Sequence, residues 1–488
     1  MDLASKEAYK TFRWAILIPI ALSSFIHLWN PAGFPDIFYD EGVYMRRAMH
    51  LLEGMGPQEG TFYDHPYFGQ LLLSGFLGAT GYPGSLDPSP TSQSIESLYA
   101  VPRVLMGIFA VVDTFLIYKI SEKRYGSRVA LIPSILFAVM PITWLTRRIL
   151  LDSILLPFFL ASILFALYAG NATGSKKIAM VLISGFFLGT AIFTKIPVFT
   201  MIPLISYLIY SGSAKNRPKI LGLWFIPVIL MPMIWPAYSA SIGQFDFWMR
   251  DVVWQTQRQS DRFPTIVRGF FLYDPVLLVL GIAGFIYAAI KRQLFILLWI
   301  VPFVIFLSAI GYVQYFYWIP VLPVFCIAAG QLVDRATHVK QRLLPYATIA
   351  GLGIFGLAST IPLVIADVTS AQFDAAAFVA DYDDNETTIV SSPDYSWIFM
   401  YVFDKEHVFT DYRDLLFYPV ETDKIILISD QHFQYDVGAG KQLRDAYNNT
   451  RPIETFSGNV YNFDLSRYPY TSMAANYEGS KVEVRISN

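Results

Sequence analysis

The chain has 488 residues, of which 54% are hydrophobic and only 15% charged, and its formal net charge is -2. Soluble globular domains carry about 25% charged residues, so this composition argues against a soluble protein, and the near-neutral charge gives no support for nucleic-acid binding. The single cysteine, Cys326, excludes an intramolecular disulfide framework. The composition therefore predicts an integral membrane protein.

Apolar runs long enough to cross a bilayer recur along residues 14–366. The first run follows three basic residues, Lys6, Lys10 and Arg13, and no small-residue cleavage pattern comes after it. We therefore expect an uncleaved helix there rather than a signal peptide. The runs predict about eleven spanning helices, at residues 14–28, 98–119, 128–146, 150–169, 178–194, 197–211, 219–240, 275–290, 294–310, 313–331 and 344–366.

Basic residues in the short connections predict the orientation, because such clusters stay on the cytoplasmic side of a membrane. With the N-terminus in the cytoplasm and an odd number of crossings, every cluster falls on that side and the C-terminus lies outside. The clusters are Lys119, Lys123, Arg124 and Arg128; Lys176 and Lys177; Lys215, Arg217 and Lys219; Lys291 and Arg292; and Arg335, Lys340 and Arg342. We expect a multi-pass protein of the cell membrane.

Three longer segments then lie outside, at residues 29–97, 241–274 and 367–488. The first contains helical patterns at about 41–53 and 67–76, and the second of these is short enough to be an interfacial or re-entrant helix. The last segment mixes short β-rich runs with helix-like stretches, at 387–391, 424–429, 459–463 and 439–447. We expect a transmembrane domain, residues 1–366, followed by an extracytoplasmic α/β domain, residues 367–488.

Ionisable side chains near apolar helices are informative, because a charge that faces lipid is costly. Asp113 falls inside a predicted span, whereas the others gather near the outer interface. One cavity that holds a carboxylate base and several cations suits a reaction that expels a phosphate. The candidate residues for such a site are Asp40, Glu41, Asp64, His65, Arg103, Arg147, Arg148, Asp152 and Lys195.

Each of these residues also has a purely structural explanation. Asp40 and Glu41 fit the N-cap and first turn of a helix, where acids favour the positive end of the macrodipole. Arg147 and Arg148 fit an ordinary turn, although arginines on the outer side go against the usual charge bias. Lys195 fits a snorkelling side chain at a helix end, and His65 fits the start of a helix. Position alone leaves both explanations open.

Several short motifs resemble one family of enzymes. The stretch Thr146–Ser153, TRRILLDS, resembles the Ser-Arg-aromatic-Ile-Leu-Leu-Asp-Ser stretch of the dolichyl-phosphate-mannose protein O-mannosyltransferases, with Arg148 in place of the aromatic residue. The pair Asp40-Glu41, the run DHPYFG from Asp64, and the run VPRV around Arg103 resemble further motifs of that family, in the same order. The resemblance covers about residues 14–240. The C-terminal outer domain is closer in plan to the prokaryotic lipid-A aminoarabinose transferases.

The resemblance implies the GT-C fold and a glycosyltransferase of the outer face. Its donor would be a polyprenyl- or dolichyl-phosphate sugar carrying mannose, aminoarabinose or another hexose or pentose, and its acceptor a protein, a lipid or a glycan. A single displacement would invert the anomeric centre. Some GT-C enzymes use a divalent metal, but the number of cations here predicts that no metal or other cofactor is required.

The resemblance also suggests a role for each candidate residue. Asp40 would be the base, and Glu41 would orient the acceptor or the first helical turn. Cationic charge for the leaving phosphate would come from Arg103, Arg147, Arg148 and Lys195. Asp152 would hold an arginine in place, and Asp64 and His65 would contact substrate.

Two other classes of protein fit the composition. A multi-pass transporter would place polar groups near the bilayer midplane, in broken helices that recur in two halves. Here the charges lie near the outer face and no second copy is detectable. A membrane-anchored binding or sensory protein would explain the outer tail, but would leave the outer-face charges without a role.

Overall fold

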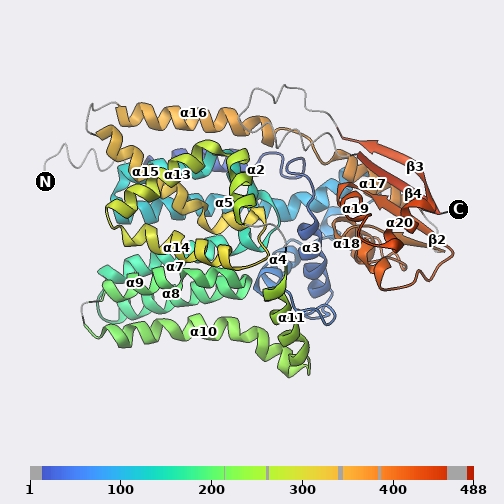
Figure 1. Cartoon of the computed structure of the whole chain (residues 1–488), viewed down its shortest axis with the longest axis horizontal. Coiled ribbons are helices and arrows are strands. Elements are labelled where there is room, and N and C mark those ends of the chain that lie inside the picture. Colours follow the sequence, from blue (N-terminus) through green and yellow to red (C-terminus); the bar gives the residue numbers. More distant parts are fainter. Residues whose placement is uncertain are drawn as a thin grey trace.

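A computed structural model describes residues 14–213, 215–259, 263–338, 344–382, 386–458 and 481–487. Long helices lie side by side along the long axis of the molecule, and a small sheet lies at one end of them (Figure 1). The elements of the helical part are α2 (Leu17–Leu28), α3 (Tyr39–Leu52), α4 (Phe68–Ala79), η1 (Gly84–Leu86), α5 (Ser92–Tyr125), α6 (Ser127–Val139), η2 (Pro141–Arg147), α7 (Leu151–Asn171), α8 (Gly174–Thr194), η3 (Ile196–Met201), α9 (Ile202–Ser211), α10 (Arg217–Ser241), α11 (Phe245–Gln257), α12 (Phe263–Tyr273), α13 (Pro275–Ile290), α14 (Leu294–Ala309), η4 (Tyr315–Val321), α15 (Leu322–His338) and α16 (Leu344–Val364).

Each of the predicted spans coincides with a helix or a pair of helices. Within the described residues, six helices are long and apolar enough to cross a membrane, or up to eight if each of two bent pairs is one span. Three of the remaining predicted spans correspond to the shorter apolar helices Leu17–Leu28, Ile196–Ser211 and Leu294–Ala309. The chain is a multi-pass helical membrane protein, and the number of crossings and the orientation of the termini stay predictions.

The bend between α6 and η2 has a local cause. Pro141 disfavours helical backbone in the residue before it, and Met140 is accordingly extended, with φ -72° and ψ 139°. The axes of α6 and η2 therefore meet at 68°. Arg148 and Leu150 are also extended, so the chain passes from η2 to α7 in a short non-helical stretch. The side chains of Arg147 and Arg148 are buried there.

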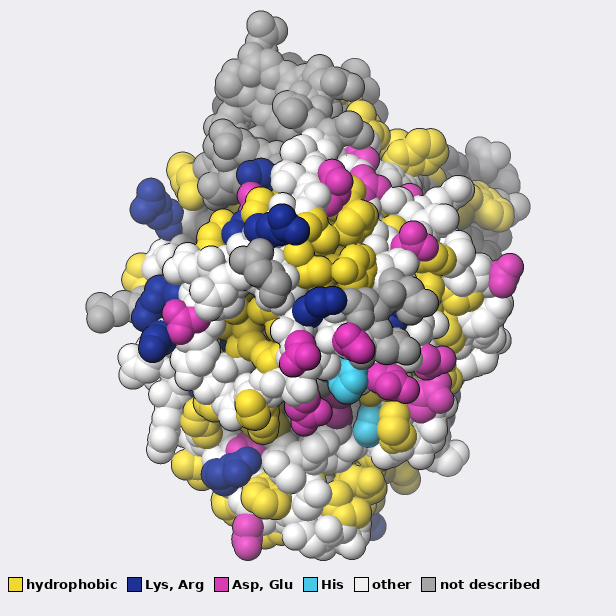
Figure 2. All heavy atoms as spheres, turned by 90° about the vertical axis from the view of Figure 1, so that its right-hand side faces the viewer, with side chains coloured by type: hydrophobic (Ala, Val, Ile, Leu, Met, Phe, Trp, Pro, Cys, Tyr) yellow, Lys and Arg dark blue, Asp and Glu magenta, His cyan; other side chains and the backbone are white. Residues whose placement is uncertain are grey.

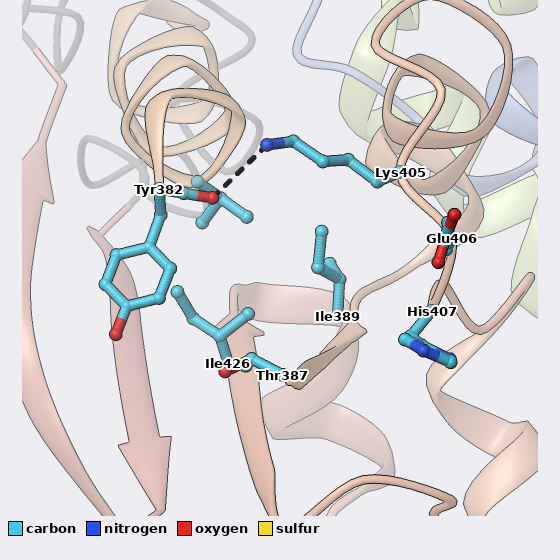
Figure 3. A pocket seen from close by; sticks show the side chains of 8 residues that line it. Tyr382, Thr387, Ile389, Lys405, Glu406, His407 and Ile426 are labelled. Carbon is cyan, nitrogen blue, oxygen red and sulfur yellow. Dashed lines mark hydrogen bonds between the residues drawn. The ribbon is translucent and has the colours of Figure 1, made fainter. Parts of the chain in front are cut away.

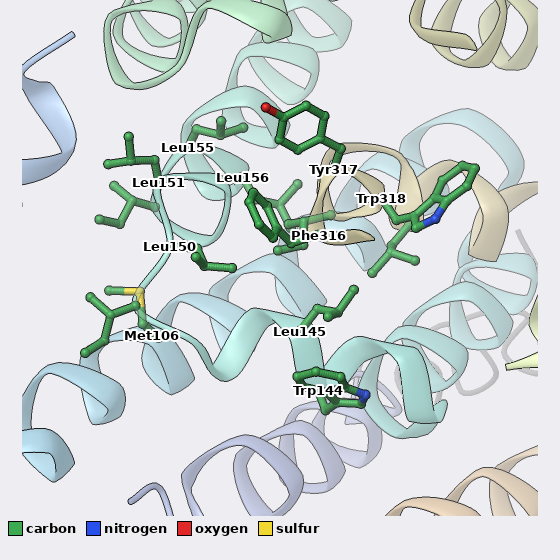
Figure 4. Close-up of a cluster of buried hydrophobic side chains, with 14 of the residues drawn as sticks. Met106, Trp144, Leu145, Leu150, Leu151, Leu155, Leu156, Phe316, Tyr317 and Trp318 are labelled. Carbon is green, nitrogen blue, oxygen red and sulfur yellow. The ribbon is translucent and has the colours of Figure 1, made fainter. Parts of the chain in front are cut away.

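Apolar side chains surround this stretch. Leu145, Leu150 and Leu156 pack with Phe316 and Trp318 of η4, and all five are almost fully buried (Figure 4). A buried large side chain contributes about 1.5–3 kcal/mol relative to an exposed one, so this cluster fixes the positions of η2 and η4 relative to α7. The charged residues near the N-terminus of α7 are therefore held in fixed positions.

The C-terminal residues form the predicted α/β domain. Its elements are α17 (Ser370–Asp381), β1 (Thr387–Val390), α18 (Pro393–Tyr401), η5 (Tyr412–Leu416), β2 (Lys424–Ser429), α19 (Gln431–Asp436), α20 (Lys441–Asn448), β3 (Thr450–Ser457) and β4 (Lys481–Ser487). The strand order is β1-β2-β4-β3, with β1 parallel to β2 and the other pairs antiparallel. Two predicted β-runs are β1 and β2, and the third, 459–463, lies outside the described residues.

This domain, called the outer domain after the side of the membrane that the sequence predicts for it, packs directly on α3. A Cβ atom on Gly42 would lie 2.2 Å from the carbonyl carbon of Pro393 and 2.3 Å from the backbone nitrogen of Asp394. Only glycine permits so close an approach of two backbones. The hydroxyl of Tyr99 on α5 adds a hydrogen bond of 2.6 Å to the Asp394 carbonyl. The outer domain is therefore attached to the N-terminal parts of both α3 and α5.

A small hollow inside the outer domain lies between α17, β1 and β2 (Figure 3). Lys405 crosses it and donates a hydrogen bond of 3.3 Å to the carbonyl of Tyr382. The hollow holds about 20 Å³, which is room for about one water molecule. It is too small for a substrate.

Candidate active site

The first turn of α3 points two neighbouring carboxylates in different directions. Phe38 is extended and precedes the helix, and its backbone N–H donates a hydrogen bond of 3.0 Å to the Glu41 carboxylate. Successive residues of a helix are about 100° apart, so Asp40 and Glu41 face different surroundings. Glu41 faces the protein interior, and Asp40 faces a cavity.

Glu41 is fully buried at the centre of an ion-pair network. One oxygen accepts from Arg103 Nε and from the backbone N–H of Ile149, both at 3.0 Å. The other accepts from Arg103 Nη2 at 2.7 Å and from Arg148 Nη1 at 3.3 Å. Arg148 also pairs with Asp36 at 2.5 Å, so two guanidinium groups are balanced by two carboxylates. A buried charge set of this kind is tolerated only when its members are paired and hydrogen-bonded.

Arg103 of this network, together with Arg147, also holds the chain that leads from α2 into α3. Arg103 Nη1 donates to the carbonyl of Pro35 at 2.7 Å, and Nη2 donates to that of Asp36 at 2.9 Å. Arg147 Nη2 donates to the carbonyls of Trp29 and Asn30, both at 2.7 Å. Arg103 and Arg147 are each 1% exposed. The structure therefore places both among backbone carbonyls, away from the cavity wall.

The cavity beside α3 has a volume of about 710 Å³. Asp40, Val43, Tyr44 and Arg47 line it from one face of α3, at the i, i+3, i+4 and i+7 spacing that groups side chains on a helix. The other walls come from Lys195 at the end of α8, from residues 312–317, from Arg258 after α11, and from residues 410–418 of the outer domain. The cavity thus lies between the membrane helices and the outer domain.

The surroundings of Asp40 suit a general base. Among the described residues, none donates a hydrogen bond to its carboxylate, so both oxygens remain available to a ligand. Burial raises the pKa of Asp40 to about 6, against the opposing effect of Lys195. A carboxylate with a pKa near the working pH is largely ionised at neutral pH and still accepts a proton readily.

Lys195 and Arg258 bring positive charge to the same cavity. Lys195 Nζ pairs with Asp152 at 2.5 Å and lies 4.4 Å from the ring centre of Tyr317. An ammonium group has three donors, so the pair with Asp152 leaves donors for an anion. Arg258 lies 3.6 Å from the ring centre of Tyr312 and donates to the side chain of Gln255 at 3.2 Å. Within the described ranges it pairs with no carboxylate.

Asp64 and His65 also line the cavity. Burial favours a higher pKa for Asp64, but the ion pair with Arg47, at 2.7 Å, together with His65 and the hydrogen bonds to the carboxylate, lowers that pKa to about 2. Burial also lowers the pKa of His65 to about 3, so its imidazole is neutral at pH 7. Asp64 is therefore a paired carboxylate, and His65 is a neutral donor and acceptor.

The predicted candidates thus divide into two groups. Asp40, Asp64, His65 and Lys195 line the cavity, with Asp152 directly behind Lys195. Glu41, Arg103, Arg147 and Arg148 form the buried set behind α3. The sequence did not predict that Arg47, Arg258 and the outer-domain residues belong to the site. The helical spacing of Arg47 from Asp40 was a usable signal, whereas nothing local links residues 410–418 to this cavity.

A second cavity, of about 500 Å³, lies at the outer ends of α2, α5 and α16. The charged side chains that line it, Glu96 and Asp367, are both acidic, so it is less suited to a phosphate. No group of three or more His, Cys, Asp or Glu side chains with metal-binding geometry occurs within the part of the chain that the structure describes.

Comparison with known proteins agrees with this architecture. Residues 15–234 match the family model of dolichyl-phosphate-mannose-protein mannosyltransferases. The fold is similar to that of ArnT from Cupriavidus metallidurans, solved bound to undecaprenyl phosphate, with a TM-score of 0.56 and 11% identity over 98% of each chain. The chain therefore has the GT-C fold that its sequence resemblance predicts.

A second solved structure has the same fold. This is the archaeal oligosaccharyltransferase AglB from Archaeoglobus fulgidus, in complex with an inhibitory peptide and a dolichol-phosphate. The TM-score is 0.55 and the identity 13%, over 94% of this chain and 75% of AglB. No curated protein matches the chain by sequence. At these identities the two structures show the fold alone.

Proposed function

We propose that this protein is a glycosyltransferase that moves a sugar, mannose or a related hexose or pentose, from a polyprenyl or dolichyl phosphate to an acceptor hydroxyl on the outer face of the membrane. The observation that carries the proposal is the cavity in which Asp40, a carboxylate without a partner among the described residues, faces Lys195 and Arg258. Undecaprenyl phosphate and dolichol-phosphate in the two structures of similar fold support a lipid-linked donor.

In this reaction the acceptor oxygen attacks the anomeric carbon as Asp40 takes the hydroxyl proton. The bond between that carbon and the phosphate oxygen breaks, and its electron pair leaves with the lipid phosphate. Lys195 and Arg258 stabilise the charge that develops on the phosphate, and the low-dielectric cavity strengthens this effect. One displacement inverts the anomeric centre and leaves no covalent intermediate on the protein.

The buried set acts on this reaction by position. Glu41 fixes the first turn of α3, and Arg103, Arg147 and Arg148 fix the chain that enters it. Their donors are turned toward backbone carbonyls and carboxylates, so we assign the phosphate contacts to Lys195 and Arg258 instead. Asp152 orients Lys195 rather than an arginine. Asp64 and His65 remain candidates for substrate contacts at the cavity wall.

The test is the release of label from dolichyl phosphate [³H]mannose by purified protein in lipid nanodiscs that contain a membrane extract as acceptor. We expect turnover by the wild type and a loss of about 10²–10⁴-fold in Asp40→Asn, which keeps the shape of the side chain but cannot take the proton. Asp423→Asn, an exposed carboxylate of the outer domain, is the matched control. Equal turnover in wild type and Asp40→Asn removes Asp40 as the base, and no turnover with any lipid-linked sugar removes the function.

A further inference from the structure

The outer domain forms one side of the cavity, and this side carries groups that the transfer reaction leaves without a role. Residues 410–418, which include η5, line the same cavity as Lys195. Lys195 stands at the end of a membrane helix, whereas η5 belongs to the domain at the outer end of the molecule (Figure 1). If the donor phosphate lies at Lys195, the acceptor must approach Asp40 from the side of the outer domain.

This wall is held at a fixed position relative to the base. The hydroxyl of Tyr39, the residue before Asp40, donates to the Asp411 carboxylate and accepts from Arg413 Nη1 at 3.1 Å. Arg46, on the next turn of α3, donates to the carbonyl of Thr410 at 3.0 Å. Three contacts therefore tie residues 410–413 to the helix that carries Asp40, and the wall is part of the site.

The main chain of the wall is already occupied by internal hydrogen bonds. The backbone N–H of Arg413 donates to the Asp411 side chain at 3.0 Å, and those of Phe417 and Tyr418 donate to the Asp414 carbonyl at 2.9 and 2.8 Å. An extended peptide is usually held by main-chain hydrogen bonds to an open strand edge. These residues do not present a row of free backbone N–H groups, so a ligand on this wall must be recognised by side chains.

The side chains that this wall presents to the cavity are aromatic rings flanked by charged groups. Phe417 is 76% exposed and Tyr418 is 63% exposed, although both line the cavity. Large exposed rings in a water-facing domain are typical of binding surfaces. Acidic and basic side chains also lie close together on this end of the molecule (Figure 2). Asp414 and Arg413 line the cavity with the rings. Arg413 also pairs with Asp436 at 2.5 Å, and because a guanidinium has five N–H donors it keeps others for a ligand.

We propose that residues 410–418 form the acceptor subsite and that the acceptor is a saccharide. A pyranose ring has an apolar face, formed by its axial hydrogens, and a rim of hydroxyl groups. The rings of Phe417 and Tyr418 bind the apolar face, and Asp414 and Arg413 bind the rim. The acceptor hydroxyl then points toward Asp40. The inference deepens the proposed function and rests on it.

The first measurement is binding, which needs no turnover. The probes are the methyl glycosides of mannobiose, cellobiose and maltose, added to the full chain in nanodiscs free of glycoside detergent and followed by saturation-transfer NMR. We expect at least one to bind, and the double variant Phe417→Ala, Tyr418→Ala to bind it about tenfold more weakly. Tyr435→Ala is the control, because Tyr435 is 90% exposed in the same domain and does not line the cavity.

The second measurement is transfer from dolichyl phosphate [³H]mannose to the bound saccharide or to a serine- and threonine-containing peptide of about ten residues. Binding lost in the double variant and kept in Tyr435→Ala supports the subsite. Equal saccharide binding in the double variant, no binding of any probe, or transfer to the peptide alone overturns it. Turnover that depends on Asp40 without saccharide binding leaves the proposed function standing and removes this inference. Saccharide binding through the two rings without consumption of any lipid-linked sugar removes the proposed function, and with it the acceptor role of this saccharide-binding site.

Discussion

Asp40 and Glu41 are neighbours in the sequence, and the structure predicts different effects when each is replaced by its amide: Glu41→Gln should lower stability, whereas Asp40→Asn should lower activity. Glu41 is 0% exposed and accepts hydrogen bonds from two arginines and two backbone N–H groups. In Glu41→Gln, one oxygen becomes an amide nitrogen that faces donors, and two guanidinium groups lose their shared counter-charge. Breaking a buried ion pair from one side costs about 3–5 kcal/mol. The same change at Asp40 removes no hydrogen bond within the described residues and should cost no more than about 0.5 kcal/mol.

The assay compares thermal unfolding and sugar release for the two variants in the same nanodiscs. One kcal/mol shifts the midpoint of a domain of 150–250 residues by about 2–4 °C and shifts that of a longer chain less, so Glu41→Gln should melt on the order of 5 °C below wild type. Asp40→Asn should melt with the wild type and lose activity. A Glu41→Gln protein that melts like the wild type, or an Asp40→Asn protein that melts several degrees lower, would refute the division of roles.

Three further predictions follow from the cavity and the packing of α3. Sugar release should rise with pH through about 6, because burial raises the pKa of Asp40 to that value and only the ionised carboxylate takes a proton; a pH–rate profile of the wild type checks this. Lys195→Ala should lower kcat by about 10²–10³-fold, and Lys195→Arg should retain part of it, as measured by donor-saturated turnover. Gly42→Ala should loosen the outer domain, because the new Cβ would meet the Pro393 backbone at 2.2 Å; limited proteolysis should then cut between residues 366 and 393 more readily than in Gly75→Ala, where a Cβ meets nothing within 4 Å.

The sequence predicted the helical part of the fold closely, because hydrophobic length is a strong signal in a membrane protein. The helix predicted at 41–53 is α3, Tyr39–Leu52, and the boundary predicted at residue 366 falls between α16 and α17. The 119° bend between α12 and α13 was not predicted, since Asp274-Pro275 was placed at the edge of a straight span. The residue before a proline is biased away from helical backbone, which is a local signal for that break.

The candidate site was harder to predict, for a geometric reason. The sequence places Asp40, Glu41, Arg148 and Lys195 near one face of the membrane, but it does not say which side of α3 each one occupies. Asp40 and Glu41 differ by one residue and therefore by about 100° around the helix, which is enough to separate the cavity from the interior. The outer-domain wall depends on contacts between residues more than 370 positions apart, such as Tyr39 with Arg413, and no local pattern reports them.

Arg148 gives the sharpest remaining test of the buried set, because it stands where the similar mannosyltransferases have an aromatic residue. Its guanidinium lies 5.0 Å from the ring centre of Phe38 and pairs with Asp36 and Glu41. Arg148→Phe should restore the aromatic contact and still destabilise the chain, because Asp36, at 5% exposure, then keeps its charge without this partner.

Adding Asp36→Asn to Arg148→Phe removes the carboxylate charge that Arg148 no longer balances. Arg103 and Glu41 remain as a balanced pair, so the double variant should be more stable than the sum of the single effects by at least about 1 kcal/mol. Thermal unfolding of the wild type, the two single variants and the double variant measures this coupling. Additive effects would mean that Asp36 and Arg148 do not neutralise each other, and the argument that this arginine serves position rather than phosphate binding would fail with it.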